Sequence, residues 1–248
     1  MIKNNLKQGI KHLLELGGYK ITNKAQFGID ILADIKTILQ SSKELTLFDI
    51  GANRGQTSVE IARIFPKSQI YSFEPDPNTY ADLIEKTKAI SEIKTFNIGF
   101  GSKKGRLQMN INKGSGGNSI LSISDKIKDL AFGDWTECIG QREVELTTLN
   151  SFCDEQSIKY VDLIKLDTQG YELQILEGGT KVTPSFTKVV FIEVLFEELY
   201  MNQAYFQDIY KILTERGFKL AGLYNKFNKI ESPHNLLWCD ALFVSDSL

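Results

Sequence analysis

The chain has 248 residues, of which 42% are hydrophobic and 24% are charged, and its formal net charge is -2. This composition is typical of an ordinary globular protein, and the length favours one large α/β domain over two small ones. The nearly balanced charge gives no overall basic field that would attract nucleic acid, so nucleic-acid binding is not expected.

The cysteines and the opening residues indicate in which cellular compartment the protein is expected. Cys138, Cys153 and Cys239 are widely spaced and form no C-x-x-C pair. This pattern argues against a disulfide framework or a zinc knuckle and favours reducing conditions. The opening residues MIKNNLKQGIKHLLELGG space their apolar residues between lysines, unlike the single apolar block of a signal peptide. Since no apolar run reaches the roughly 18–20 residues of a membrane span, we expect a cytoplasmic protein without stable membrane insertion.

Two helical patterns begin the chain. Apolar residues recur at helical spacing over residues 2–14 and again over 27–40, and Gly17-Gly18 ends the first pattern. Lysines flank the first apolar stripe, which favours the solvated side of a docking helix over a helix lying on a membrane surface. The sequence therefore predicts an N-terminal helical cap over residues 1–43.

Beyond the cap, apolar runs alternate with helical patterns. Strands are predicted over residues 45–50, 69–74, 94–98, 161–166, 188–194, 217–223 and 237–244. Helices are predicted over residues 55–65, 78–89, 170–178 and 203–216. This alternation predicts an α/β domain over residues 44–248, with a Rossmann-like, seven-stranded, mostly parallel sheet and helices on both faces. In such sheets ligands bind outside the carboxyl ends of the strands.

One stretch departs from the alternation. Residues 99–150 contain GSKKGRLQMNINKGSGGNSILSI and, later, REVELTTLNSF, which suggest two strands with a Gly/Ser loop between them. A structureless loop of that length would be unusual inside a compact domain. We therefore predict a β-hairpin insertion.

A glycine-spaced turn follows the first predicted strand of the domain, in FDIGANRGQTS. Glycines between a strand and a helix allow backbone N–H groups to approach a ligand with no Cβ in the way. Asparagine tolerates positive φ, so Asn53 can replace the second glycine of such a turn. The spacing is neither the G-x-G-x-x-G dinucleotide fingerprint nor a P-loop. A tight turn with a purely structural role is the alternative.

The second predicted strand ends on an acid, Glu74, within YSFEPDP. An acid at this place, one strand beyond a glycine turn, can accept hydrogen bonds from both hydroxyls of a ribose. Pro75 and Pro77 would hold it rigidly. The alternative is a surface acid at the start of a loop.

Taken together, these motifs resemble those of FkbM-type methyltransferases, a branch of the class I enzymes that use S-adenosylmethionine. The resemblance covers about residues 45–245 and rests on FDIGANRGQTS, YSFEPDP, FNIGFG, VELTTLNSF, FIEV and, most specifically, DLIKLDTQGYELQILEGG. Asn150 departs from the pattern, because the family usually has Asp there, and we assign it no role.

The resemblance implies that S-adenosylmethionine is the methyl donor and that it lies across the ends of the first strands. The turn Gly51–Gly55 would pass its methionine portion, and Glu74 would hold its ribose. The segment NIGFG would begin its adenine pocket, and GGNS at 116–119 would close over the cofactor. Carboxylates near the positive sulfur are electrostatically favourable. The expected cofactor-binding residues are Asp49, Gly51, Asn53, Gly55, Glu74, Pro75, Asn97, Gly99 and Asp167.

A hydroxyl acceptor also needs a base. The candidate catalytic residues are Asp167, which ends the fourth strand, Lys165, Glu193 and His234. Each has a simpler alternative: Lys165 and Glu193 could form a structural ion pair, and His234 could be an exposed loop histidine. Glu172 could serve only the dipole of its helix. Asp167 and Glu193 could also bind Mg²⁺, but two acids without further ligands do not predict a metal site.

The favoured function is therefore an S-adenosylmethionine-dependent O-methyltransferase acting on a hydroxyl of a sugar, a glycan or a secondary metabolite. Two alternatives remain at this point: a nucleotide-dependent oxidoreductase, because Glu74 would also suit the ribose of NAD, and a non-catalytic binding module on the same fold. Methylation of nucleic acid is less well supported, since the chain contains no [ND]-P-P-[YF] segment for a flipped base and no excess of basic residues.

Overall fold

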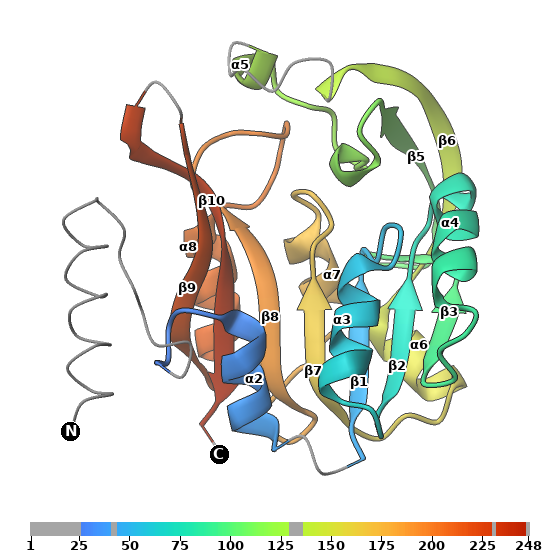
Figure 1. Ribbon diagram of the computed structural model, residues 1–248. Coiled ribbons are helices and arrows are strands. Elements are labelled where there is room, and N and C mark those ends of the chain that lie inside the picture. Colours follow the sequence, from blue (N-terminus) through green and yellow to red (C-terminus); the bar gives the residue numbers. More distant parts are fainter. Residues whose placement is uncertain (1–25, 41–43, 129–135, 230–231, 247–248) are drawn as a thin grey trace, which may run out of the picture.

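The computed structural model describes residues 26–40, 44–128, 136–229 and 232–246. Its centre is a seven-stranded sheet in the order β3-β2-β1-β7-β8-β10-β9 (Figure 1). The strands are β1 (Thr46–Ile50), β2 (Gln69–Phe73), β3 (Ile93–Phe96), β7 (Val161–Leu166), β8 (Thr187–Leu195), β9 (Phe218–Lys229) and β10 (Ser232–Ser245). The first five of these pair in parallel, whereas β10 runs antiparallel to β8 and β9. The predicted mostly parallel sheet is confirmed.

Helices cover both faces of this sheet, as predicted (Figure 1). One face carries α2 (Ile31–Leu39), α3 (Gln56–Ile64) and α4 (Pro77–Thr87), and the other carries α6 (Leu149–Glu155), α7 (Glu172–Gly178) and α8 (Phe206–Glu215). Several begin at side-chain caps: Asp30 accepts from the Ala33 amide before α2, and Asp76 accepts from the Thr79 amide before α4. Such caps satisfy amides that have no partner within the helix.

Helix α6 is an element that the sequence did not predict. Its first residues directly follow the alternating segment VELTT, whose β-branched side chains favoured a strand. Thr148 ends that strand, because its hydroxyl accepts a hydrogen bond from the Ser151 amide at 3.0 Å and so caps the helix. The cap places Phe152 of α6 against the sheet.

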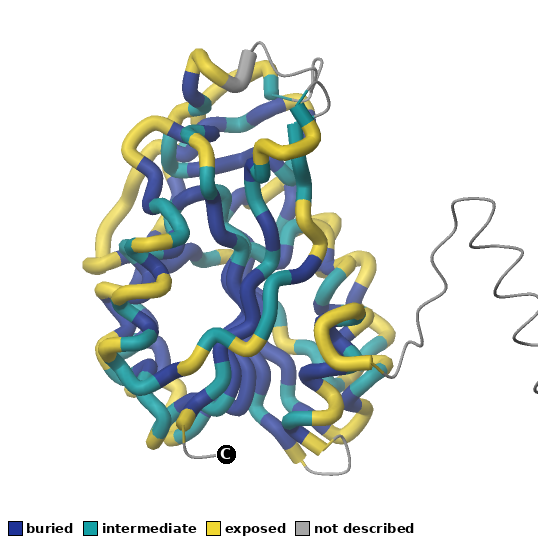
Figure 2. Tube along the Cα trace, turned by 90° about the vertical axis from the view of Figure 1, so that its left-hand side faces the viewer, coloured by how far each residue is buried: buried dark blue, intermediate teal, exposed yellow. Residues whose placement is uncertain are grey.

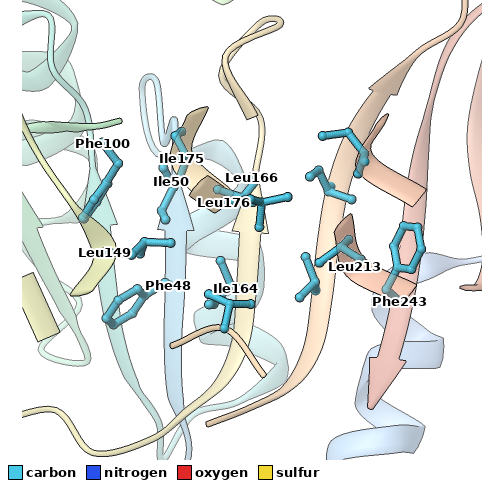
Figure 3. Packing of buried hydrophobic residues seen from close by; sticks show 14 of the residues in the cluster. Phe48, Ile50, Phe100, Leu149, Ile164, Leu166, Ile175, Leu176, Leu213 and Phe243 are labelled. Carbon is cyan, nitrogen blue, oxygen red and sulfur yellow. The ribbon is translucent and has the colours of Figure 1, made fainter. Parts of the chain in front are cut away.

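The two faces of the sheet bury alternate residues of each strand. Leu47, Leu163 and Val189 pack on the side of α2 and α3. Phe48, Ile50, Ile164 and Leu166 pack on the side of α6, α7 and α8, where Figure 3 shows them against Leu149, Ile175 and Leu176. The central strands are buried along their length (Figure 2). A sheet covered on both faces leaves its carboxyl edge as the place for a ligand.

The predicted insertion forms a second sheet above that edge (Figure 1). It consists of β4 (Gly99–Phe100), β5 (Gly105–Asn112) and β6 (Cys138–Thr147) in the order β4-β6-β5, with β5 and β6 antiparallel. The short helix η1 (Ser115–Gly117) lies in the Gly/Ser loop, and α5 (Asp125–Lys128) follows. Both predicted strands and their hairpin pairing are confirmed.

Of the two helical patterns at the start of the chain, the second is α2, and the first lies outside the described residues. The division at residue 43 stays a prediction.

Within the part of the chain that the structure describes, no helix has the length and apolar character needed to cross a membrane. All three cysteines are free thiols.

Candidate functional site

A cavity lies at the carboxyl ends of β1, β2 and β7, beneath the insertion. The residues that line it are Ile50, Gly51, Asn53, Phe73, Glu74, Pro75, Ile98, Gly99, Phe100, Met109, Ser115, Gly116, Asn118, Ile120, Leu146, Asp167, Thr168, Gln169, Tyr171 and Ile175. Six of the nine expected cofactor-binding residues are among them. The lining combines an apolar wall with two acids, as small-molecule sites commonly do.

Glu74 is the buried acid of the cavity, with 5% of its surface exposed. Its Oε2 accepts a hydrogen bond from the Asn53 amide at 3.0 Å, and its Oε1 accepts one from the Asp76 amide at 3.0 Å. Burial raises the pKa of this carboxyl to about 7, against the lowering effect of these two amides. Each oxygen retains a lone pair for a further donor, so the carboxylate can still accept two ligand hydroxyls.

Asn97 supports Glu74 from outside the cavity. It was expected to bind the cofactor, but its side-chain amide donates to the carbonyl oxygens of Glu74 at 2.8 Å and Pro75 at 2.9 Å. These bonds fix the backbone of the loop that carries the acid. Gly99 does line the cavity, where an added Cβ would lie 2.5 Å from a Leu146 methyl group.

The glycine turn behaves partly as expected. Gly51, Asn53 and Gly55 all have positive φ, at 77°, 47° and 81°, so Asn53 does occupy a glycine-like conformation. The neighbours of the glycines, however, are protein atoms. A Cβ on Gly51 would lie 1.9 Å from the carbonyl oxygen of Asp167, and one on Gly55 would lie 2.7 Å from a Leu83 methyl group. The turn is therefore compact because β7 and α4 approach it.

Asp49 and Lys165 form a buried ion pair behind the cavity. Asp49 is fully buried and is not among the lining residues; its Oδ1 lies 3.0 Å from Lys165 Nζ, and its Oδ2 accepts from the Ser58 hydroxyl at 2.5 Å. Lys165 also donates to the Gly51 carbonyl at 3.0 Å. Burial would lower the pKa of Lys165, but the Asp49 and Asp167 carboxylates outweigh it and raise that pKa above its ordinary value. Lys165 is therefore a cation at neutral pH.

Asp167 lies where this ion pair meets the cavity. Its side chain is 40% exposed, and its Oδ2 is 3.5 Å from Lys165 Nζ. Gln169 bridges it to Glu193: the amide Nε2 donates to Asp167 Oδ1 at 2.8 Å and to Glu193 Oε2 at 3.0 Å. Lys165 is paired with acids, but its close carboxylate partners are Asp49 and Asp167, so the alternative of an ion pair with Glu193 is wrong.

Glu193 belongs to a group of acids on neighbouring elements. Burial, and then the negative charges of Asp167 and Glu172, raise its pKa well above the ordinary value. Asp240 on β10 is its cross-strand partner, and burial raises the pKa of Asp240 to about 6. Sequence reasoning missed Asp240, because a single acid in an apolar strand gave no sign that the strand lies next to β8.

Glu172 has a defined structural role. Its Oε1 accepts from the Thr168 amide at 2.7 Å and from the Thr168 hydroxyl at 3.0 Å, which fixes the turn between β7 and α7. Burial raises the pKa of Glu172 to about 7. His234 is exposed near the start of β10, before the residues that pair with β8, and it is not among the residues that line the cavity.

The insertion contributes residues to the cavity, and Gly116 and Asn118 of the expected GGNS segment are among those that line it. The Ser115 hydroxyl donates to Asn53 Oδ1 at 3.0 Å, and the Ser119 hydroxyl donates to the Gln169 carbonyl at 2.8 Å. Arg142 forms an ion pair with Asp76. The sequence predicted the Gly/Ser loop, and the tertiary fold brings this loop over the sheet.

Within the described ranges, no three His, Cys, Asp or Glu side chains cluster as a metal ion would require.

The chain is similar to known proteins over most of the domain. The model of the methyltransferase FkbM domain matches residues 49–220. The 2-O-methyltransferase NoeI of Sinorhizobium fredii is 29% identical over 161 residues, which are 63% of this chain and 66% of that protein. The methyltransferase sdnD of Sordaria araneosa is 28% identical over 158 residues, which are 53% of this chain and 59% of that protein. The chain thus spans less than two thirds of the length of these curated relatives.

A solved structure shares the fold. The methyltransferase FkbM from Methylobacillus flagellatus KT superposes with a TM-score of 0.50 at 15% identity, covering 81% of this chain and 43% of that chain. The agreement at such low identity concerns the arrangement of the elements. It supports the Rossmann-like fold that the sequence predicts.

Proposed function

Because this chain belongs to the family of methyltransferase FkbM domains, we propose that it transfers a methyl group from S-adenosylmethionine to a hydroxyl of a sugar, a glycan or a secondary metabolite. The 2-O-methyl transfer in the name of one relative supports a hydroxyl acceptor. The observation that carries the proposal is the cavity with Glu74 at the end of β2 and Asp167 at the end of β7.

The lining of the cavity suits the donor. Glu74 would accept the ribose hydroxyls, and Ile98, Phe100 and Leu146 offer an apolar surface for the adenine. Pro75 and Gly99 would border the same end of the cavity, and the turn at Gly51 would border the methionine portion. Bound S-adenosylmethionine supplies an electrophilic methyl group on a positively charged sulfur. The neighbouring carboxylate of Asp167 would stabilise this positive charge.

We assign the proton-accepting role to Asp167. It combines exposure to the cavity with a fixed carboxylate, and a base of this kind contributes typically 10²–10⁴-fold to a rate. Lys165 remains protonated, so its contribution is to hold Asp167 and the Gly51 carbonyl in place. Asp49 balances the charge of Lys165 from the protein interior. Glu193 and His234 are the remaining candidates for the base.

The acceptor is proposed to be a small molecule or a glycan. The formal net charge of -2 offers no general attraction for a polyanion. The test is to incubate the full chain with S-adenosylmethionine carrying an isotopically labelled methyl group and a panel of glycans, simple glycosides and hydroxylated metabolites. Mass spectrometry should find the labelled methyl ether on one class of acceptor, and the Asp167→Asn variant should lose most of this signal.

Controls separate this function from its alternatives. Nicotinamide cofactors should give no thermal shift where S-adenosylmethionine gives one, since only a ligand of the native state stabilises it. Stabilisation by NAD alone would favour the oxidoreductase. Stabilisation by S-adenosylmethionine with no transfer to any acceptor class, and none to water, would favour a non-catalytic binding module.

A further inference from the structure

Gln169 occupies the turn between β7 and α7 in a backbone conformation that glutamine seldom adopts. Its φ is +58°, in the left-handed region that favours glycine and asparagine. Gly170, with φ +94°, follows it, so the chain reverses here over two consecutive residues. Such outliers persist where the surrounding structure fixes them, and they cluster at functional sites. The side chain of Gln169 shows what fixes it.

Every hydrogen-bonding atom of the Gln169 side chain is engaged. Nε2 donates to Asp167 Oδ1 at 2.8 Å and to Glu193 Oε2 at 3.0 Å, while Oε1 accepts from the Tyr200 hydroxyl at 2.6 Å. The orientation of the amide follows from chemistry, because two carboxylates require the NH₂ group and a hydroxyl donor requires the oxygen. One amide thus spans two acids on adjacent strands.

Tyr200 can act as a donor to the amide over a wide pH range. It is 5% exposed, and burial, followed by the charges of Glu193 and Asp167, raises the pKa of its hydroxyl well above the ordinary value. The backbone of Gln169 is also held, because the Ser119 hydroxyl of the insertion donates to its carbonyl at 2.8 Å. The amide is therefore fixed at both ends, by a buried tyrosine and by the cover of the cavity.

We propose that Gln169 is a positioning residue, whose side-chain amide holds the Asp167 carboxylate toward the acceptor and joins Asp167 to Glu193 through one shared donor. The inference rests on the proposed function, because Asp167 is its proposed proton acceptor. A hydrogen bond to the ionised form of a carboxyl favours that form. Without the amide, the two acids would face each other with no shared donor.

The site contains several other charged groups that bear on a titration of these acids. Those that face Asp167 and Glu193 from the packed elements are Asp49 on β1, Lys165 on β7, Glu172 on α7, Tyr200 after β8 and Asp240 on β10. All of them remain in a variant that changes Gln169 alone. A shift in titration on that change therefore reports the loss of the amide.

The experiment compares four variants with the wild type in the full chain. Gln169→Met keeps the length of the side chain and removes its hydrogen bonds, and Tyr200→Phe removes only the hydroxyl that orients the amide. Gln108→Met at an exposed position of β5, and Tyr80→Phe, whose hydroxyl contacts Thr95, repeat the same chemical changes away from the site. Carbon-13 labels on the Asp and Glu carboxyl carbons, assigned with Asp167→Asn and Glu193→Gln, follow each acid by NMR as pH changes.

In Gln169→Met we expect the titration midpoint of Glu193 to rise by about one pH unit, and in Tyr200→Phe by less, because lost hydrogen bonds disfavour the ionised form. The two control variants should keep the wild-type midpoints. With an acceptor found by labelled transfer, kcat of Gln169→Met should fall by about tenfold or more while the donor Kd changes by less than about threefold. A role in packing alone would lower the melting temperature without moving the midpoints.

An unchanged midpoint of Glu193 in a folded Gln169→Met protein overturns the proposal. If that variant does not fold, Gln169→Asn takes its place, because asparagine accepts positive φ and is too short to span both acids. It must show the same rise, and an unchanged midpoint of Glu193 in Gln169→Asn overturns the proposal equally. The NMR result requires no acceptor or donor, so it is separate from failure of the wild type to bind S-adenosylmethionine, which would contradict the proposed function.

Discussion

Two acids of the cavity are held in different ways. Glu74 is enclosed and accepts only backbone amides, so burial dominates its pKa, which lies at about 7. Asp167 is 40% exposed and lies beside the cation of Lys165. An enclosed acid that holds two fixed amides suits the binding of neutral hydroxyl groups. An acid that is open to the cavity beside a cation suits contact with a reacting molecule.

The role of Glu74 predicts a loss of donor affinity in Glu74→Gln, which keeps the size of the side chain and removes its charge. We expect S-adenosylmethionine to bind more weakly by about 1–3 kcal/mol, the usual cost of hydrogen bonds to a charged group. Calorimetry measures this directly. The variant Glu143→Gln, at an acid on β6 whose side chain is 54% exposed, is the control and should bind as the wild type does. Equal affinities of wild type and Glu74→Gln would remove Glu74 from the donor site.

The pKa of Glu74 also predicts a pH dependence. Ribose hydroxyls donate to the ionised carboxylate, and the fraction of Glu74 that is ionised increases as pH rises through about 7. The affinity for S-adenosylmethionine should therefore rise from pH 6 to pH 8 in the wild type, with proton release on binding below pH 7. In Glu74→Gln the same interval should show a much flatter profile. A wild-type profile as flat as that of the variant would contradict the assignment.

Asp167→Asn separates the chemistry from the fold. The substitution preserves the shape of the side chain, and Lys165 retains Asp49 as its ion-pair partner. We expect labelled-methyl turnover to fall by roughly 10²–10⁴-fold, with little change in melting temperature and a smaller effect on donor affinity than in Glu74→Gln. The exposed Asp82→Asn variant serves as the control for charge. Wild-type turnover in Asp167→Asn would move the role of base to Glu193 or His234.

For individual residues, the sequence predicted the acids at strand ends but not the hydrogen bonds and ion pairs that their neighbours form with them. Glu74 and Asp167 line the cavity because acids at the ends of parallel strands converge there. Asn97 follows a strand end too, yet its amide turns back to the loop backbone. Asp240 enters through the pairing of β10 with β8, and that register depends on tertiary packing.

Among the elements, the turn after β1 is limited by the approach of β7. Gly51→Ala would place a methyl group 1.9 Å from the Asp167 carbonyl oxygen, at a φ of +77°. We expect the free energy of unfolding to fall by at least about 1–2 kcal/mol, the cost of a left-handed conformation alone. Gly105→Ala is the matched control, because nothing lies within 4 Å of its added Cβ. Chemical denaturation that finds the two variants equally stable would show that the turn can relax.

Helix α6 packs against the sheet through an aromatic cluster. The ring of Phe152 contacts those of Phe48, Tyr71, Phe73, Phe96 and Phe100, with centroid distances from 4.8 to 6.3 Å. Its side chain is almost completely buried. The cluster thus joins β1, β2, β3 and β4 to one helix. The apolar residues of the strands predicted this core, but the helix that completes it was not predicted.

Phe152→Ala should therefore destabilise the protein strongly. Removal of a buried phenylalanine typically costs about 3–5 kcal/mol in the free energy of unfolding, and the dense packing here leaves few ways to fill the cavity. Denaturant titration measures the change. Phe27→Ala, at a residue that is 48% exposed, should remain within about 0.5 kcal/mol of the wild type. A loss below about 1 kcal/mol for Phe152→Ala would contradict this account of the core.

At the scale of the whole molecule, the insertion turns an open sheet edge into a cavity. Contacts with the loops at that edge include Ser115 with Asn53, Ser119 with Gln169, and Arg142 with Asp76. The sequence predicted the order of strands and helices well, because each strand is a compact apolar run and each helix has its own period. It placed GGNS at 116–119 over the cofactor, and Gly116 and Asn118 do line the cavity. It could not predict the contacts that hold this loop, since they join residues far apart in the chain.

The central claim is that this cavity binds S-adenosylmethionine. The most direct test is a calorimetric titration of the full wild-type chain with S-adenosylmethionine at pH 8, where Glu74 is ionised, and with NAD as the comparison ligand. The account predicts saturable one-to-one binding of S-adenosylmethionine, a rise in melting temperature with the same ligand, and no binding of NAD. A folded protein that shows neither heat of binding nor a thermal shift with S-adenosylmethionine would contradict it.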